Sequence, residues 1–294
     1  MGHVGIKNAN AVRTVAVLGG GTMGNGIAHV FARSGYAVIL RDIDQHYLDR
    51  ALETISKNLD REIKKGTVAA AEKPNILARI RPVTDMVAVA AADFVVEAVP
   101  ERLELKREVL AQADLVLRPE AILATNTSSI SITLLAAATR RPDRFVGMHF
   151  MNPVPVMALV EVIRALQTGD AAFATTMQLC ERIGKKPVAV NDSPGFVSNR
   201  VLMPLINEAA FCVMEGVAAP EAVDAVMKLG MNHPMGPLEL ADFIGLDVCV
   251  DVLEVLFEGF RDPKFRPCPL LRKMVAAGWL GRKSGRGFYT YSRT

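Results

Sequence analysis

The sequence predicts an α/β protein in which a doubly wound sheet is followed by an all-α C-terminal domain. Two observations carry this prediction. A glycine-rich turn follows an early apolar run and opens a helix, and strand signals recur from there until about Val190, where they fade. We therefore place the domain boundary near residues 190–195, with residues 1–191 as the first domain and residues 192–294 as the second.

The composition predicts a globular protein and argues against two classes of partner. Half of the 294 residues are apolar, 22% are charged, and the net charge is +3. Nucleic-acid binding needs a more concentrated basic surface, although a small phosphorylated ligand remains compatible with this charge. There is no uncharged apolar run of about 18 residues, so we predict no membrane span. The short N-terminal segment lacks an apolar signal core, and we expect a cytoplasmic protein.

The cysteine pattern predicts reduced core thiols and no metal site. No two cysteines form a CxxC pair, which zinc sites and thioredoxin-like redox motifs use. The four residues are Cys180, Cys212, Cys249 and Cys268.

The stretch from Thr14 to Asp44 has the pattern of a dinucleotide-binding site. TVAVL is a short strand, three glycines follow in GxGxxG spacing, and an acid ends the next strand, 18 residues after the third glycine. Such glycines permit a tight turn, an approach of the pyrophosphate to the backbone and close packing of helix on strand. We therefore predict a Rossmann-type domain. The expected cofactor contacts in the turn are Gly19, Gly21, Thr22, Met23 and Gly24.

The acid at the end of the second strand, Asp42, predicts a preference for NAD over NADP. Its carboxylate can accept both ribose hydroxyls and would repel a 2′-phosphate. Arg41 precedes it, and an arginine here can favour NADP. Because neighbouring residues of a strand point to opposite faces, we expect Arg41 to lie outside the pocket.

A helical pattern from about Ile43 to Gly66 carries a basic face, for which two interpretations remain open. One is a solvated surface, and the other is a clamp for an acidic ligand such as a nucleotide phosphate. The cations are Lys57, Arg61, Lys64 and Lys65.

Polar residues follow two further predicted strands. Glu97 ends the strand ADFVVEAV, and Glu101 and Lys106 follow on a loop and helix, where surface salt bridges are the alternative interpretation. The residues 126–129 follow the strand AILAT as a turn and helix cap, so that simple N-capping is the alternative role for Ser128. Ligands of such sheets bind at the carboxyl ends of strands, which makes this turn a candidate site.

The run FVGMHFMNPVPVMALVEVI, residues 145–163, contains one histidine and one glutamate in an otherwise apolar stretch. His149 comes directly after the predicted strand RFVGM, and Glu161 lies in the apolar segment beyond it. A buried carboxylate is costly unless it is paired, and an imidazole is the obvious partner. A static buried pair and an acid–base catalyst both fit this spacing.

The second half predicts helices. A long helix follows Pro194-Gly195, with a kink at Pro204 and more apolar positions than one face requires, so we expect it to be buried within the domain or against a second subunit. Two or three further helices reach about Gly278, residues 236–247 form a loop, and the end forms a turn and a short strand. Asn199 would face a cleft between the domains.

Several motifs, in this order along nearly the whole chain, resemble the L-3-hydroxyacyl-CoA dehydrogenases, and in particular the short bacterial 3-hydroxybutyryl-CoA dehydrogenases of fatty acid metabolism. They are GGGTMGNGIA, VVEAVPE, NTSSISIT, GMHFMNPVPVMALVEVI, DSPGFVSNR, PMGPLELADFIGLD and GRKSGRGFYTY. One departure is Ala158, where many relatives carry lysine.

The resemblance implies a role for individual residues and for a second copy of the chain. His149 matches the catalytic histidine and Glu161 its partner acid, while Ser128 and Asn199 match donors to the reacting oxygen. The implied cofactor is NAD, the implied substrate is an acyl-CoA, and the implied assembly is a homodimer through the helical domain. Further NAD contacts are implied at Asp42, Glu101, Lys106, Asn126, Ser128, Asn152 and Lys283, and coenzyme A contacts at Asn58 and Lys65.

Two other readings stay open at this point. A sugar-acid dehydrogenase, such as one acting on L-gulonate, would share the scaffold and most motifs. A non-catalytic structural relative would share the fold, although the retained polar residues argue against lost activity.

Overall fold

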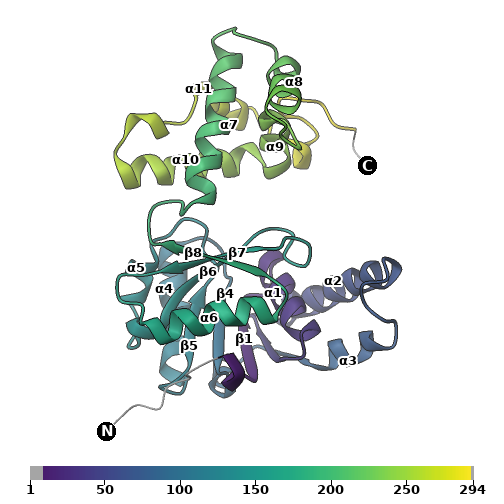
Figure 1. Ribbon diagram of the computed structural model, residues 1–294, viewed down its shortest axis with the longest axis vertical. Helices are drawn as coiled ribbons and strands as arrows, with labels where there is room; N and C mark the ends of the chain where they lie inside the picture. The colour runs from purple at the N-terminus through teal and green to yellow at the C-terminus, as the bar shows by residue number, and fades with distance from the viewer. Residues whose placement is uncertain (1–8, 293–294) are drawn as a thin grey trace. The chain divides into compact units, whose positions relative to one another are not determined.

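The computed structural model describes residues 9–292 and forms two compact units, Met1–Asp192 and Ser193–Thr294 (Figure 1). The first unit is built on one sheet and the second consists of helices. The predicted fold class, a Rossmann-type doubly wound sheet followed by an all-α unit, is confirmed.

The sheet of the first unit has eight strands in the order β3-β2-β1-β4-β5-β6-β7-β8. The chain runs outward from β1 in one direction and then from β4 in the other, so the strand order reverses between β1 and β4, which is where doubly wound sheets bind ligands. The strands are β1 Thr14–Leu18, β2 Ala37–Arg41, β3 Ile80–Val83, β4 Phe94–Glu97, β5 Ile122–Thr125, β6 Phe145–Phe150, β7 Leu159–Arg164 and β8 Lys186–Asn191.

Helices cover both faces of this sheet. Helices α1 and α6 share one apolar cluster on one face, and α4 and α5 lie on the other (Figure 1). The helices are α1 Thr22–Arg33, α2 Gln45–Lys64, α3 Glu72–Ala78, α4 Leu103–Val116, α5 Ile132–Ala136 and α6 Asp170–Arg182, with short 3-10 turns η1 Ala9–Ala11, η2 Met86–Ala91 and η3 Pro142–Arg144.

Every residue of strands β4, β5 and β6 is buried. Central strands covered by helices on both faces are normally continuous apolar runs. The polar side chains within them therefore need a partner, and they are Glu97, Thr125 and His149.

One strand pairing departs from the parallel pattern. Strands β6 and β7 are antiparallel, and β7 is parallel to β8. The structure also extends β6 to Phe150, so His149 lies inside the strand, and the prediction that it follows the strand is wrong. The sequence run RFVGM ends at the last letters before the histidine, and the pairing with β7 prolongs the strand beyond them.

The second unit packs four of its helices into one apolar core, which contains residues of α7, α9, α10 and α11. The long helix α7 continues through Pro204. The elements are α7 Ser198–Met214, α8 Pro220–Gly230, α9 Pro237–Ile244, α10 Leu246–Phe260 and α11 Pro269–Ala276, with 3-10 turns η4 Pro263–Phe265 and η5 Arg282–Ser284.

The predicted loop at residues 236–247 is wrong, because this segment forms α9 and the start of α10. Up to residue 292, four α-helices therefore follow α7, rather than two or three. The Asp224 carboxylate explains the error, since it accepts the amides of Leu238 and Glu239 and so caps α9 from helix α8. A cap supplied from 14 residues away leaves no local signal in the sequence.

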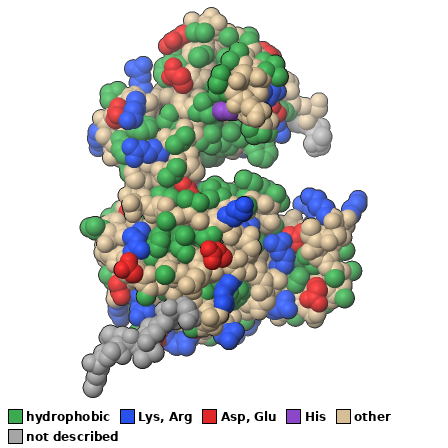
Figure 2. All heavy atoms as spheres, in the orientation of Figure 1, with side chains coloured by type: hydrophobic (Ala, Val, Ile, Leu, Met, Phe, Trp, Pro, Cys, Tyr) green, Lys and Arg blue, Asp and Glu red, His purple; other side chains and the backbone are tan. Residues whose placement is uncertain are grey.

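Exposed apolar side chains are frequent on the second unit, where Figure 2 shows hydrophobic side chains over much of the visible surface. On α7, Met203 and Ile206 are buried, whereas Val201 is 67% exposed and Met214 is 41% exposed. The surplus of apolar residues on this helix is thus only partly buried within its own unit. No helix within residues 9–292 is long and apolar enough to span a bilayer.

Candidate active site

The turn after β1 brings two backbone segments into contact that only glycine permits. Gly19 has a φ of +102°, and a Cβ there would lie 2.8 Å from the carbonyl oxygen of Ala98. A Cβ on Gly24 would lie 1.8 Å from the carbonyl oxygen of Gly19. A Cβ on Gly21, by contrast, would meet nothing within 4 Å. The first and third glycines therefore serve close packing, and the second faces open space that a ligand can use.

Helix α1 begins in this turn with amides that no side chain caps. Its N-cap residue is Gly21, and Thr22 is the first helical residue. The Asn25 side chain donates to the carbonyl oxygen of Gly21 at 2.7 Å and holds the turn in place. Met23 packs against the apolar core instead of the open side. Uncapped amides at a helix start attract phosphate, so the turn fits the pyrophosphate of a dinucleotide.

The carboxylate of Asp42 is oriented by two backbone amides at the end of β2. Gly20 donates to Oδ2 at 2.6 Å and Ile43 donates to Oδ1 at 2.7 Å. Arg41 directs its Nε to the carbonyl oxygen of Thr84 at 3.2 Å. The acid is thus fixed against the glycine turn, where a ribose would lie beside the pyrophosphate, and the arginine is engaged elsewhere.

A pocket of about 410 Å³ opens beside the glycine turn. Three segments line it: the turn and the start of α1, one face of α2, and the β6–β7 loop. The lining residues are Gly20, Gly21, Thr22, Asn25, Gly26, Tyr47, Arg50, Ala51, Thr54, Asn58, Asn152, Pro153, Val154 and Pro155.

The basic residues of α2 do not all face this pocket. Arg50 and Asn58 line it, whereas Lys57 pairs with Glu53 at 2.5 Å along the exposed side of the helix. Lys65 is the exposed C-cap of α2 and does not belong to the pocket lining. The helix therefore combines a solvated charged face with a separate face toward the pocket. Arg50 was not among the predicted residues, because it lies about two helical turns before the basic run that begins at Lys57.

His149 and Glu161 face each other across the antiparallel strands β6 and β7. They are direct partners in the strand register, and Nδ1 of His149 lies 2.8 Å from Oε2 of Glu161. Exposure is 8% for the histidine and 2% for the glutamate. Directly opposed residues of an antiparallel pair have close Cβ atoms, so backbone pairing alone sets this contact. The structure thus brings together the two titratable groups of the apolar run.

The turn that carries Ser128 is organised by one carboxylate. Oε1 of Glu101 accepts from the Thr127 hydroxyl at 2.5 Å, from the amide and hydroxyl of Ser128 at 2.9 and 3.2 Å, and from the amide and hydroxyl of Ser129 at 3.1 and 3.0 Å. Burial opposes ionisation of Glu101, but Lys106 and these donors outweigh it and hold the pKa of the carboxyl below its usual value. Helix α5 is capped by Ser131, so the alternative of Ser128 as a simple N-cap is wrong.

Lys106 and Glu97 form a buried pair beneath that turn. The lysine Nζ lies 2.7 Å from Glu97, 3.0 Å from the carbonyl oxygen of Val99 and 3.3 Å from Glu101. Its side chain is 1% exposed, and that of Glu97 is 0% exposed. The alternative of a surface salt bridge is therefore wrong for Lys106. A helix residue that reads as solvated reaches the sheet because α4 packs it against the end of β4.

Two asparagines frame the end of β6. Oδ1 of Asn126 accepts from the amide of Phe150 at 2.9 Å and ties the end of β5 to β6. Asn152 is the second residue of the β6–β7 loop, precedes a cis peptide bond to Pro153, and lines the pocket. Of these two predicted cofactor contacts, Asn126 therefore has a backbone partner and Asn152 faces the pocket.

The two remaining predicted residues belong to the second unit. Asn199 lies in the first turn of α7. Nζ of Lys283 lies 2.6 Å from the carboxylate of Asp247, at the start of α10. Their part in a site with residues of the first unit stays a prediction.

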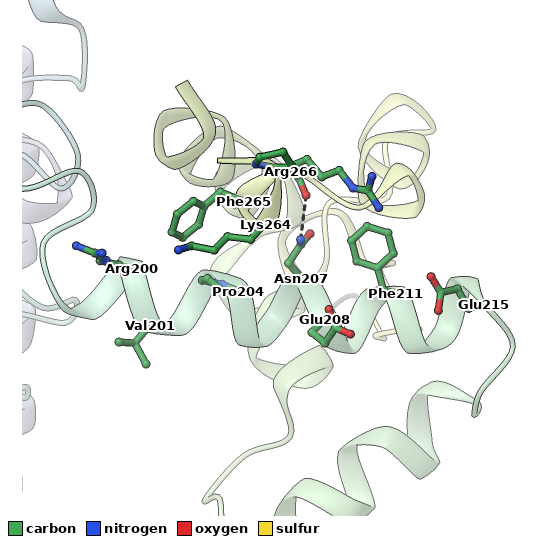
Figure 3. A pocket seen from close by; sticks show the side chains of 11 residues that line it. Arg200, Val201, Pro204, Asn207, Glu208, Phe211, Glu215, Lys264, Phe265 and Arg266 are labelled. Atoms are coloured by element: carbon green, nitrogen blue, oxygen red, sulfur yellow. Dashed lines mark hydrogen bonds between the residues drawn. The ribbon is translucent and has the colours of Figure 1, made fainter. Parts of the chain in front are cut away.

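The second unit also has a groove of about 900 Å³ between α7 and η4 (Figure 3). Asn207 donates to the carbonyl oxygen of Arg266 at 3.0 Å across its floor, and the Arg266 guanidinium lies over the ring of Phe211. No sequence motif indicates this groove, since its two sides are about 60 residues apart in the chain.

Comparison with known proteins places the chain in a family. Residues 14–193 match the NAD-binding domain of the 3-hydroxyacyl-CoA dehydrogenases, and residues 195–291 match the C-terminal domain of the same enzymes. The chain belongs to the 3-hydroxyacyl-CoA dehydrogenase family. It is an NAD-dependent oxidoreductase, as the glycine turn and the acid after β2 indicate.

Similar members of this dehydrogenase family match the chain over nearly its full length. A probable 3-hydroxybutyryl-CoA dehydrogenase of Deinococcus radiodurans is 56% identical over 94% of this chain and 99% of its own. One of Bacillus subtilis is 53% identical over 95% and 98%. The crystal structure of (S)-3-hydroxybutyryl-CoA dehydrogenase from Ralstonia eutropha is 53% identical, with a TM-score of 0.94 over 96% of this chain and all of that one. The resemblance found in the motifs is thereby confirmed.

Proposed function

We propose that this dehydrogenase interconverts short-chain (S)-3-hydroxyacyl-CoA, with 3-hydroxybutyryl-CoA as the expected substrate, and the corresponding 3-ketoacyl-CoA. The observation that carries the mechanism is the 2.8 Å contact of His149 and Glu161 in a buried strand pair. The substrate is inferred from the names of the similar enzymes.

In the proposed reaction His149 is the general base. Oxidation of a secondary alcohol breaks one C–H and one O–H bond while a carbonyl forms. The imidazole takes the hydroxyl proton, and Nε2 would accept it because Nδ1 faces Glu161. Imidazoles suit this role since they titrate near neutral pH.

Glu161 would stabilise the imidazolium that forms. In a buried site an uncompensated cation is costly, and a carboxylate 2.8 Å away lowers that cost. The same contact fixes the ring orientation and places the proton of the neutral imidazole on Nδ1, as a carboxylate does beside other catalytic histidines.

Ser128 and Asn199 would donate hydrogen bonds to the substrate oxygen. Charge builds on that oxygen during the reaction, and positioned donors stabilise it. The backbone amide of Ser128 donates to Glu101, so the residue stays anchored while its hydroxyl rotates toward a substrate. Glu101 and Lys106 would serve the cofactor side chiefly by fixing this turn.

The residues of the glycine turn and Asp42 would hold the cofactor. When bound, NAD supplies the hydride acceptor. The amides at the start of α1 would bind its pyrophosphate, and the Asp42 carboxylate would accept a ribose hydroxyl. The other residues assigned to this site by family resemblance are Asn126, Asn152 and Lys283.

The coenzyme A moiety would contact the first unit along α2. Asn58 lines the pocket and Lys65 caps the helix, and the resemblance assigns both to coenzyme A. We add Arg50 to this set because its guanidinium is the cation that lines the pocket, and planar guanidinium groups suit phosphate oxygens.

We also propose that the chain forms a homodimer through its second unit. Large apolar side chains are exposed there, among them Leu229 at 88%, Val217 at 70% and Val201 at 67%. Patches of this kind commonly mark protein interfaces. Sedimentation should give about twice the chain mass of 31.8 kDa, and a monomer at all concentrations would contradict the proposal.

The proposed substrate is tested by initial rates at 340 nm. Acetoacetyl-CoA is compared with free acetoacetate and with a keto sugar acid, each with NADH and with NADPH. We expect kcat/KM to be at least about 10²-fold higher for the CoA ester, because the free acids lack the remote contacts that lower the barrier. We expect a similar preference for NADH, since Asp42 would repel the 2′-phosphate. A higher kcat/KM for a sugar acid would replace the proposed substrate with the alternative one.

A further inference from the structure

Lys185, directly before β8, is a buried lysine that the proposed chemistry does not use. It is 6% exposed. Its Nζ donates to the carbonyl oxygen of Val154 at 2.5 Å and to that of Met157 at 2.7 Å. Within residues 9–292 no carboxylate oxygen lies within 4 Å of this ammonium group. The partners of the lysine are thus two backbone carbonyls of the β6–β7 loop.

The β6–β7 loop, residues 151–158, connects the strands that carry His149 and Glu161 and also forms one wall of the pocket. Asn152, Pro153 and Pro155 face the pocket, opposite the glycine turn. Val154 also belongs to the lining but is only 2% exposed, and it packs on Gly26 of α1 so closely that a Cβ there would lie 2.8 Å from the Val154 Cβ. The loop is therefore held from two sides, by α1 and by Lys185.

Burial of a lysine at this position costs more free energy than burial of an apolar side chain would. Burial, as the largest effect, and the guanidinium of Arg33 together lower the pKa of Lys185 to about 8, although the carboxylate of Glu62 acts in the opposite sense. A depressed lysine pKa means that the unfolded chain binds more protons between about pH 8 and the ordinary lysine value, so this group weakens the fold at neutral pH. An apolar side chain would avoid that cost, but it would leave two inward carbonyl groups without a donor.

We propose that Lys185 is a positioning residue for the dinucleotide site: its ammonium fixes the β6–β7 loop so that Asn152 and Pro153 keep their place opposite the glycine turn. The inference rests on the proposed function only in taking the glycine turn and the β6–β7 loop as the NAD side of this pocket, while Arg50 and Asn58, proposed for coenzyme A, lie on α2. Loss of the lysine should loosen one wall of that site while the His149–Glu161 pair, held by strand pairing, stays in place.

The test compares K185M with K186M. Met keeps most of the volume of the lysine and removes its donors, and the exposed neighbour Lys186 is the matched control. The dissociation constant of NADH is measured by fluorescence titration without substrate, followed by KM and kcat for each substrate. For K185M we expect the dissociation constant of NADH and the KM for NADH to rise about tenfold, because the loop loses one or two hydrogen bonds. KM for acetoacetyl-CoA should change less than threefold, and K186M should match the wild type.

The pH dependence of NADH binding provides a second measurement, which does not require K185M to fold. The wild-type dissociation constant should rise above about pH 8, as the ammonium loses its proton. K185R should show no such rise, because a guanidinium keeps its charge. The charged groups that face Lys185 are Arg33 on α1 and Glu62 on α2, with His29 beside Glu62, and guanidinium and carboxylate groups keep their charge in this range.

A folded K185M that binds NADH as the wild type does would overturn the inference, as would the same pH dependence in wild type and K185R. Equal increases of KM for both substrates would also overturn it, because they indicate general loosening. Failure of the proposed substrate would look different: wild-type protein would then bind NADH normally and reduce no acyl-CoA.

Discussion

Within the described residues, the first unit contains two histidine–glutamate pairs, which differ in their geometry and in the charges around them. His149 and Glu161 lie on adjacent strands, in register, with Nδ1 and Oε2 2.8 Å apart. His29 on α1 is fully buried, and its Nε2 lies 3.3 Å from Oε2 of Glu62 on α2. Neither ring nitrogen of His29 makes a hydrogen bond within the described residues.

The clearest difference between the two pairs is the second cation beside Glu62, which is Arg33. Arg33 donates to Glu62 at 2.6 Å, so that carboxylate already has a permanent counter-charge. Burial raises the pKa of Glu62, but its contacts with His29 and Arg33 outweigh burial and hold the pKa below its usual value. A proton gained by His29 would therefore find its partner already neutralised. Burial of a histidine beside a glutamate does not by itself indicate catalysis; the competing charges decide.

Replacement of His149 should have the largest effect on turnover, and a fully active variant would contradict the distinction between the two pairs. We expect H149A to lower kcat by about 10³-fold, because the site loses its general base. The dissociation constant of NADH, measured by fluorescence, should stay within twofold of the wild type. Loss of NADH binding together with turnover would indicate misfolding and would leave the proposed role unsupported.

The next largest effect on kcat should distinguish Glu161 from Glu62. We expect E161Q to lower kcat by at least about 10²-fold, since the imidazolium loses its counter-charge and the ring its orientation. E62Q is the matched control, with the same chemical change in the other pair, and should leave kcat within twofold. An unchanged kcat in E161Q would refute the proposed mechanism.

A smaller effect is expected when the second histidine is replaced. In H29L an apolar side chain takes the place of a ring without hydrogen bonds, and Arg33 continues to pair with Glu62. The free energy of unfolding in urea should change by less than about 1.5 kcal/mol, in either direction, and kcat should stay within twofold. A tenfold loss of kcat in a stable H29L would show that both pairs serve the reaction.

The smallest effect concerns acid stability. Because the pKa of Glu62 is depressed in the folded chain, the group stabilises the fold above its unfolded pKa, and that contribution is lost as pH falls through the folded value. Urea unfolding between pH 7 and 3 should therefore show a shallower loss of stability for E62Q than for the wild type. Identical slopes would mean that Arg33 and His29 do not hold the carboxylate as the distances indicate.

The fold class could be predicted from the sequence, and so could the proximity of His149 and Glu161. A lone acid and a lone base in an apolar run had to meet, because neither is stable alone in a core. We did not predict that they meet across an antiparallel strand pair, although Asn152-Pro153 marks a turn and the connection is too short for a parallel crossover. His149 was accordingly placed after its strand, whereas it lies inside it.

Contacts between distant segments account for the remaining differences. Surface salt bridges were the alternative to a cofactor contact for Glu101 and Lys106. Only the packing of α4 against the end of β4 shows that they support the Ser128 turn. The segment at residues 236–247 was predicted as a loop because of its acidic residues, while the Asp224 cap that starts α9 comes from another helix. Lys185 belongs to no recognised sequence motif, and only its two contacts with backbone carbonyls indicate its structural role.

The contact between His149 and Glu161 depends on the register of the antiparallel strands β6 and β7, which an insertion or deletion in the connecting loop could change. Glu161 stands between Val160 and Val162, and consecutive strand residues face opposite ways. If one inserted or deleted codon in the residues 151–158 shifted this register by one residue, a valine would lie opposite His149, and the Glu161 carboxylate would turn to the other face of the sheet without its imidazole partner. The length of this connection therefore bears on the proposed reaction and on the stability of the fold together.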